Sequence, residues 1–156
     1  MKKITKQQIV DYWETRVNEC DLGTDFDEGT TRCWCCGRST RSLEKAHIVP
    51  KMLGGEYEVW NLILLCTTCH KEEPDFDNPD YMWDWIKANS DINYDSYIIK
   101  RMVNEYEKMF GKLEFNGDEE KLKSAFKRAV KKSGWHGGIS SYATKACILK
   151  EAIDAV

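Results

Sequence analysis

The chain has 156 residues, of which 42% are hydrophobic and 31% are charged, with only three prolines. This composition excludes an intrinsically disordered chain, and it provides enough apolar residues for one domain or for a compact core with a helical extension. The formal net charge of −3 excludes a strongly basic protein, so an affinity for nucleic acid would have to come from local patches of basic residues.

The beginning of the chain, MKKITKQQIVDYWE, contains lysines but lacks the apolar core of a secretory signal. No run of about 18 apolar residues follows, which argues against a membrane span. We therefore expect a cytoplasmic protein without membrane partners, in which the seven cysteines stay reduced. In a reduced protein the spacing of cysteines reports on metal binding.

The first predicted element is a helix over residues 5–19, because Thr5 and Gln8 form a capping-box pattern followed by apolar residues at helical spacing. The polar segment at 20–31 is a predicted loop. Residues 32–65 contain short extended segments with turn signals at Gly37 and at Gly54-Gly55, which favours one or two β-hairpins.

Helices dominate the remainder of the chain. A short helix is predicted to open at Asn78-Pro79, and three longer ones are predicted over residues 95–110, 118–132 and 140–154. The predicted fold class is α+β. The expected domains are an N-terminal helix and loop (1–30), a small β-rich centre (31–76), and a helical region that packs on the centre and offers a surface for DNA (77–156).

Two cysteine pairs, Cys33-x-x-Cys36 and Cys66-x-x-Cys69, have the spacing of a tetrahedral structural zinc site. Cys35 could replace a neighbour as a ligand, and buried thiols or a redox pair are the alternatives to a metal site. The 29 residues between Cys36 and Cys66 exceed the usual ~15–20 residues of a zinc ribbon, so a further element must lie inside this loop. Four cysteine ligands would leave zinc no open position for chemistry, and its role would be to stabilise the fold.

The order of motifs within and around this loop resembles the HNH nuclease family of the ββα-metal superfamily. The motifs are Cys-x-x-Cys, Ala-His-Ile-Val-Pro (46–50), Gly-Gly (54–55), and Asn-Leu-x-Leu-Leu-Cys-x-x-Cys-His (61–70). The resemblance covers about residues 32–75. It implies a ββα-metal core and a metal-dependent DNA endonuclease of a restriction-type, phage or mobile-element kind.

The resemblance also implies three catalytic residues. His47 would be the general base for the attacking water, a role that suits an imidazole with an ordinary pKa near 6.5. Asn61 would orient the His47 ring by a hydrogen bond and hold the centre of the hairpin. His70 would bind a catalytic Mg²⁺ or Mn²⁺ ion, distinct from the zinc.

The chain departs from the family pattern at Ala46, where many members have an aspartate or histidine ligand to the catalytic ion. Glu73 lies three residues after His70 on the same helical face and could be a second ligand. Glu44 shares strand parity with Ala46 but lies about 7 Å further back. His70 could also hold the ion alone, or catalysis could be lost, which would leave a zinc-stabilised nucleic-acid-binding module.

Basic residues cluster near the predicted site. Residues 32–53 contain five basic side chains and one acidic one, and Arg38, Arg41, Lys45 and Lys51 are the candidate contacts to DNA. Residues 56–80 are strongly acidic and should face away from DNA. The basic segment 121–132 could follow a second phosphate strand or be a solvated helix face. His136 is interpreted as a loop residue without a role, and cleavage of both strands would call for a homodimer.

Overall fold

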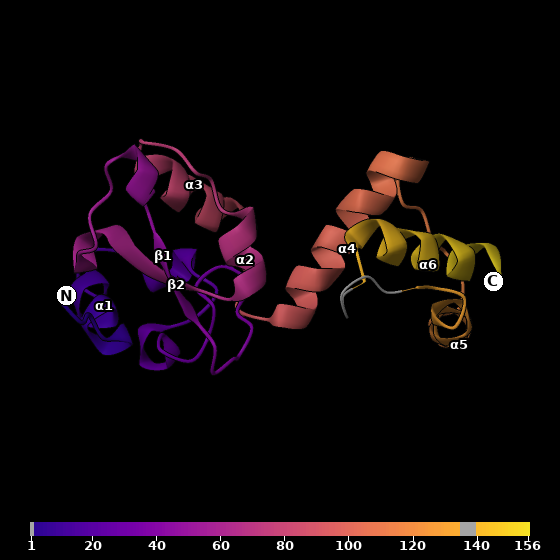
Figure 1. Cartoon of the computed structure of the whole chain (residues 1–156). Helices are drawn as coiled ribbons and strands as arrows, with labels where there is room; N and C mark the ends of the chain where they lie inside the picture. The colour runs from indigo at the N-terminus through magenta and orange to yellow at the C-terminus, as the bar shows by residue number, and fades with distance from the viewer. Residues whose placement is uncertain (1, 135–139) are drawn as a thin grey trace. The chain divides into compact units, whose positions relative to one another are not determined.

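The computed structural model describes residues 2–134 and 140–156, and it divides the chain into two compact units, Met1–Tyr97 and Ile98–Val156 (Figure 1). The division falls within helix α4 (Tyr94–Phe110). His136 lies outside the described residues. Among those described, no helix combines the length and apolarity that crossing a bilayer requires. The α+β class is confirmed by helices together with one two-stranded antiparallel sheet.

The sheet of the first unit is the predicted hairpin. Strand β1 (Glu44–His47) runs antiparallel to β2 (Leu62–Leu65), and its register sets Glu44 opposite Leu65 and His47 opposite Leu62 (Figure 1). All four residues of β2 are buried, so this strand is covered on both faces and its sequence is uniformly apolar instead of alternating. The register therefore places Glu44 beside the end of β2 that leads into α2, and His47 beside the start of β2.

Helix α1 (Lys6–Trp13) packs against β2 and begins with the predicted capping box, in which Thr5 and Gln8 bond to each other's backbone N–H groups. The helix ends at Trp13, so the prediction that it extends to residue 19 was wrong. The indole of Trp13 donates a hydrogen bond to the Leu62 carbonyl at 2.8 Å, and the Asn18 side chain caps a separate 3₁₀ turn, η1 (Glu19–Asp21). These two contacts turn the chain away from the helix axis, where apolar periodicity alone would have continued it.

The elements that frame the site are short. A 3₁₀ turn, η2 (Phe26–Glu28), precedes the first cysteine pair, and η3 (Lys51–Leu53) and η4 (Val59–Asn61) lie between the strands. Helix α2 (Thr67–Glu72) follows β2 after one residue, with Cys66 as its N-cap, and α3 (Asp80–Asn89) buries Met82 and Ile86. The chain thus passes from β2 through Cys66 to α2 within a few residues.

The second unit contains most of α4, together with α5 (Glu119–Val130) and α6 (Tyr142–Asp154). Tyr106, Ala146 and Leu149 are the centre of its core. Asp118 and Ser141 cap the two later helices through their side chains, which fixes the starts that the sequence had predicted to within two residues.

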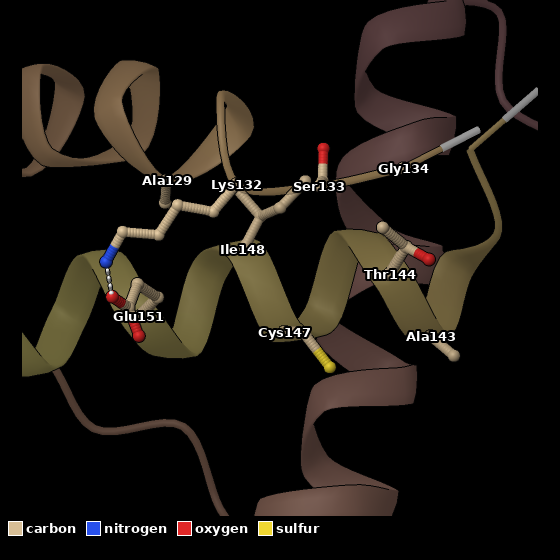
Figure 2. A pocket seen from close by; sticks show the side chains of 9 residues that line it. All are labelled: Ala129, Lys132, Ser133, Gly134, Ala143, Thr144, Cys147, Ile148 and Glu151. Atoms are coloured by element: carbon tan, nitrogen blue, oxygen red, sulfur yellow. Dashed lines mark hydrogen bonds and ion pairs between the residues drawn. The ribbon is translucent and has the colours of Figure 1, made fainter.

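Helix α5 has one apolar face and one basic face. Ala125 and Ala129 are buried on the apolar face. Lys123 of this helix is ion-paired with Glu120 at 2.7 Å, and Lys132, just after the helix, is ion-paired with Glu151. Figure 2 shows the Lys132–Glu151 pair at an open hollow of about 430 Å³, whose described lining is Ala129, Lys132, Ser133, Gly134, Ala143, Thr144, Cys147, Ile148 and Glu151.

Candidate metal centres and catalytic site

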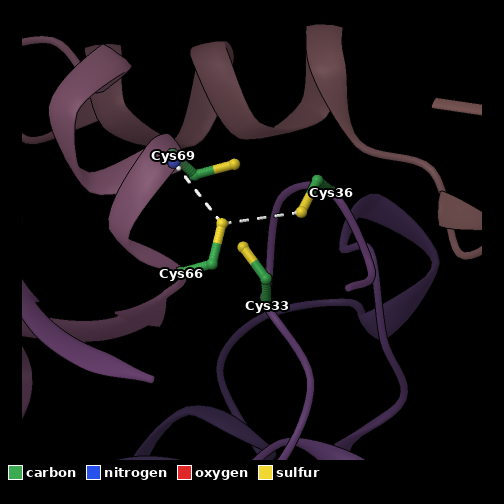
Figure 3. A group of neighbouring side chains, drawn as sticks. All are labelled: Cys33, Cys36, Cys66 and Cys69. Carbon is green, nitrogen blue, oxygen red and sulfur yellow. Dashed lines mark hydrogen bonds between the residues drawn. The ribbon is translucent and has the colours of Figure 1, made fainter. Parts of the chain in front are cut away.

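The four cysteines of the two pairs converge on one point. Figure 3 shows Cys33 and Cys36 from one loop facing Cys66 and Cys69 from the start of α2. All four Sγ atoms lie within 4.8 Å of one another, and each residue is buried. The Cys36 and Cys66 sulfurs are 3.7 Å apart, close to the ~3.8 Å between two thiolates bound at 2.3 Å to one tetrahedral zinc ion. The donor set therefore fits a structural metal ion such as zinc.

The loop that carries the first pair is folded around these sulfurs. Gly37 has a φ of +71°, and a Cβ atom at this position would lie 2.6 Å from the Asp91 carbonyl oxygen. Its N–H donates to the Cys33 carbonyl at 3.0 Å, which closes the turn. Glycine is thus required here by both backbone conformation and space, as the sequence pattern indicated.

Cys66 makes hydrogen-bond contacts with both Cys36 and Cys69. Hydrogen bonds from neighbouring thiols, that of Cys33 first, lower the pKa of Cys66, which also accepts from the Cys69 backbone N–H. Cys35 is buried but lies outside the four-sulfur cluster, and Cys20 and Cys147 are exposed. The cluster therefore consists of the four cysteines that the spacing had predicted.

His47 lies at the end of β1, half-buried, with its Nε2 atom buried and without a hydrogen-bond partner. Burial lowers the pKa of this imidazole, and the positive charges of His70 and Lys51 lower it further. The ring centroid lies 6.0 Å from that of Tyr57. An unpartnered buried ring nitrogen costs free energy in a folded protein, and such atoms are typical of sites where a water or ligand binds.

Asn61 is buried, and its amide bonds to the backbone of the loop between the strands. Its Oδ1 accepts from the Val49 N–H at 2.9 Å, and its Nδ2 donates to the carbonyls of Val49 and Glu56, each at 3.0 Å. The predicted hydrogen bond to the His47 ring is not among its contacts in the described structure. Asn61 therefore acts on the loop that leaves His47 instead of on the ring itself.

The same loop is closed tightly at Gly55. A Cβ atom on this residue would lie 1.8 Å from the Val49 carbonyl oxygen, so only glycine fits. Gly54 adopts a φ of +91° and ends the η3 turn. The Gly-Gly motif thus brings the chain back to Asn61 and fixes the backbone that follows His47.

His70 lies on α2 with a carboxylate on each side of its ring. Its Nδ1 is in direct hydrogen-bond contact with Oε2 of Glu44, and its Nε2 lies 3.4 Å from Oε1 of Glu73. The other Glu44 oxygen accepts from the Thr67 hydroxyl at 2.8 Å. The His70 hydrogen bond, followed by the Thr67 bond, lowers the pKa of Glu44.

Glu73 is the buried member of this group, with a side chain only 6% exposed. Burial raises its pKa to about 8, and the negative charges of Asp75 and Glu44 contribute. Its Oε2 atom is buried and unpartnered. A carboxylate of this kind is costly to ionise unless a cation binds beside it.

The spacing of His70 and Glu73 fits two ligands of one divalent ion. Two atoms bound at about 2.1 Å lie roughly 3.0–3.4 Å apart, depending on whether the coordination is octahedral or tetrahedral. Across the described parts of the chain, the cysteines are the single cluster of three or more potential metal ligands. The histidine site thus offers two protein ligands, and phosphate and water would complete the coordination.

The basic residues near this region differ in their contacts and in their exposure. Arg32 is engaged with Glu28 and with the carbonyls of Gly37 and Ile92. Arg38 lies 6.0 Å above the Tyr94 ring, and Arg41 and Lys51 are exposed, while Lys45 is half-buried. Arg38, Arg41, Lys45 and Lys51 have no ion-pair partner in the structure as described, which leaves them available to a polyanion.

The sequence did not predict the contact between Glu44 and His70 or the role of Thr67. The signal would be the antiparallel register. It pairs Glu44 with Leu65 and so places the Glu44 side chain near the residues that open α2. The length of the intervening loop hides this register from a reading of sequence alone.

In a comparison with known families, the model of the HNH endonuclease family matches residues 31–76. This range contains both strands, α2, the four cysteines and the three catalytic candidates. No curated protein and no solved structure matches the chain significantly. With the converging cysteines and the hairpin, the match shows that this chain carries an HNH endonuclease domain at residues 31–76.

Proposed function

We propose that the protein is a metal-dependent DNA endonuclease, with His47 as the general base and His70 and Glu73 as ligands of the catalytic ion. The observations that carry this proposal are the buried, unpartnered Nε2 of His47 and a His70–Glu73 pair spaced for one cation, with His70 near enough to His47 for its charge to affect the pKa of that ring. A restriction-type, phage or mobile-element role belongs to the same proposal.

The lowered pKa of His47 supports its role as a base, since the ring is neutral at ordinary pH and able to accept a proton from water. Asn61 supports the reaction as a positioning residue, because its three hydrogen bonds fix the loop that follows His47.

A divalent ion would stabilise negative charge on the scissile phosphate and on the leaving oxygen. Nε2 of His70 and Oε1 of Glu73 would hold it, and ionised Glu73 would be stabilised in return. We propose Mg²⁺ or Mn²⁺ as this ion, and zinc for the four cysteines. With only two protein ligands, the ion should bind weakly until a phosphate joins the coordination shell.

DNA is the proposed substrate, approached through the basic residues of the first unit. Arg38, Arg41 and Lys51 are exposed, and Lys51 is near enough to His47 for its charge to lower the pKa of the ring. Phosphate contacts of this kind would make binding salt-dependent. Two-strand cleavage would follow from a homodimer or from two sequential nicks.

A catalytically inactive, zinc-stabilised nucleic-acid-binding module is the second candidate. Ala46 favours it, since alanine stands where many family members have a ligand. Glu73 argues against it, because a buried carboxyl group whose Oε2 lacks a partner is costly to ionise in a protein that binds no cation there.

A plasmid assay separates the two candidates. Purified wild-type protein should convert supercoiled DNA to nicked or linear forms with Mg²⁺ or Mn²⁺, and not with EDTA. His47→Ala should lower the rate by about 10²–10⁴-fold while keeping one zinc per chain. Glu14→Gln, at an exposed position of the same unit, is the matched control. Equal rates for wild type and His47→Ala would refute the endonuclease proposal and favour the binding module.

A further inference from the structure

Glu44 holds both of its carboxylate oxygens in defined contacts. Oε2 contacts Nδ1 of His70, and Oε1 accepts from the Thr67 hydroxyl at 2.8 Å. Glu44 is the first residue of β1, whereas Thr67 and His70 lie on α2. The carboxylate thus ties the strand to the helix at the position of the proposed ligand.

This contact determines which nitrogen of His70 can bind a metal. An ionised carboxylate only accepts hydrogen bonds, so Nδ1 must carry the proton in the pair. In the neutral ring, the lone pair is then on Nε2, the atom that lies 3.4 Å from Glu73. Histidine ligands in metal sites generally donate their second N–H to a carboxylate or carbonyl in this way.

We infer that Glu44 is a positioning residue that fixes the Nδ1–H tautomer and the ring orientation of His70, so that Nε2 faces the ion. This inference rests on the proposed function for the identity of the ion site. It assigns the two carboxylates different tasks: Glu73 is a ligand, and Glu44 orients the histidine without touching the ion.

Thr67 links this arrangement to the zinc site. It is the first residue of α2 and follows Cys66, whose sulfur caps the helix and belongs to the cysteine cluster. The structural metal would therefore fix the start of the helix, the start of the helix places the Thr67 hydroxyl, and the hydroxyl holds Glu44. This chain of contacts compensates for Ala46, since strand β1 contributes orientation where it lacks a ligand.

The first test is the tautomer of His70 in protein that holds zinc but no catalytic ion. Nitrogen–carbon correlation NMR distinguishes Nδ1–H from Nε2–H in a neutral ring, and His70→Gln identifies the signal among the three histidines. Wild type should show Nδ1–H. Glu44→Ala should shift the population toward Nε2–H, whereas Glu44→Gln should keep Nδ1–H because its amide oxygen still accepts.

The second test is Mn²⁺ affinity, measured by calorimetry or by electron paramagnetic resonance in the presence of a non-cleavable duplex. Glu44→Ala should weaken binding by about 10–100-fold, and Thr67→Val should weaken it less, because Thr67 acts only through Glu44. Glu14→Gln should bind as wild type does. Zinc content and circular dichroism confirm that each variant is folded.

The outcomes separate this inference from the proposed function. Unchanged tautomer and Mn²⁺ affinity in zinc-loaded Glu44→Ala would overturn the positioning role, even if wild type cleaves DNA. A tautomer shift in a protein that never cleaves DNA would uphold the positioning role and refute the endonuclease. If Glu44→Ala loses zinc, the test relies on wild type and on Glu44→Gln. The inference is overturned if His70 of the wild type is in the Nε2–H form, or if Glu44→Gln loses the Nδ1–H form.

Discussion

Nε2 of His70, on α2, lies 3.4 Å from Oε1 of Glu73, the residue that caps the C-terminal end of this helix. This distance is longer than a normal N–H···O hydrogen bond and suits two ligands of one cation. Helix α2 and its C-cap residue therefore offer two potential ligands, so the site does not need a ligand at Ala46. The following predictions depend on this arrangement and on the cysteine cluster.

Removal of the Glu73 carboxylate should weaken the catalytic ion site. We expect Glu73→Gln to lower Mn²⁺ affinity by about 10-fold or more, since an amide is a poorer ligand than a carboxylate for this ion. Its raised pKa, about 8, means that the ion must displace a proton at pH 7, so wild-type affinity should rise from pH 6 to pH 8. Calorimetry across this range checks both effects. The exposed control Asp77→Asn should keep the wild-type profile, and a Glu73→Gln variant that also keeps it would exclude Glu73 as a ligand.

Loss of one zinc ligand should unfold the first unit. Structural zinc sites contribute apparent free energy on the order of 10 kcal/mol, and Cys66 both belongs to the cysteine cluster and caps α2. Cys66→Ser should therefore lose zinc and the cooperative thermal transition of this unit. Cys20→Ser, which changes an exposed cysteine, should leave zinc content and melting temperature unchanged. Elemental analysis measures the zinc content, and calorimetry measures the thermal transition. A wild-type protein that is stable without zinc would contradict the assignment of a structural zinc site to the four cysteines.

The environment of His47 should make stability fall at acid pH. Its folded-state pKa is lowered by burial first, so the unfolded chain takes up this proton earlier as the pH falls below 6.5. The contribution of His47 to stability is thus present above the unfolded pKa and declines as the pH falls from 6.5 through the folded pKa. Urea denaturation at pH 7.5 and pH 5 should show a smaller acid loss for His47→Gln than for wild type. An NMR pKa of His47 at or above 6.5 would contradict this explanation.

Replacement of Asn61 should lower the free energy of unfolding, because its amide holds the loop after His47 through three hydrogen bonds. Asn61→Ala leaves the Val49 N–H without its side-chain partner and two carbonyls without donors, at a cost of about 2–4 kcal/mol. Asn18→Ala removes one exposed cap and should cost about 1 kcal/mol or less. Denaturant titrations measure both. Equal losses would indicate that the loop does not depend on the Asn61 amide.

The zinc cluster and the hairpin were predictable because local geometry specifies them. A Cys-x-x-Cys turn directs two sulfurs to one point, and Gly37 supplies the conformation that the turn needs, so the spacing identified the four cysteines that cluster. The helix starts at Asp118 and Ser141 were predictable for the same reason, since their caps are local.

Contacts that depend on register or on tertiary packing were not predictable. The Glu44–His70 contact joins residues 26 positions apart through the pairing of β1 with β2, and no local pattern encodes that pairing. The end of α1 depends on the bond from Trp13 to the Leu62 carbonyl. The division between the two units falls within α4, whose apolar stripe continues across it, so the sequence contains no boundary signal there.

The most direct test of the account is a crystal structure of His47→Ala with Mn²⁺ and a DNA duplex, with the ion located by its anomalous signal. The account predicts an Mn²⁺ peak in contact with Nε2 of His70 and a Glu73 oxygen, and a backbone phosphate between this ion and the position of the His47 ring. An Mn²⁺ ion held away from His70, or a duplex that places no phosphate between the two histidine positions, would contradict strand cleavage at this site.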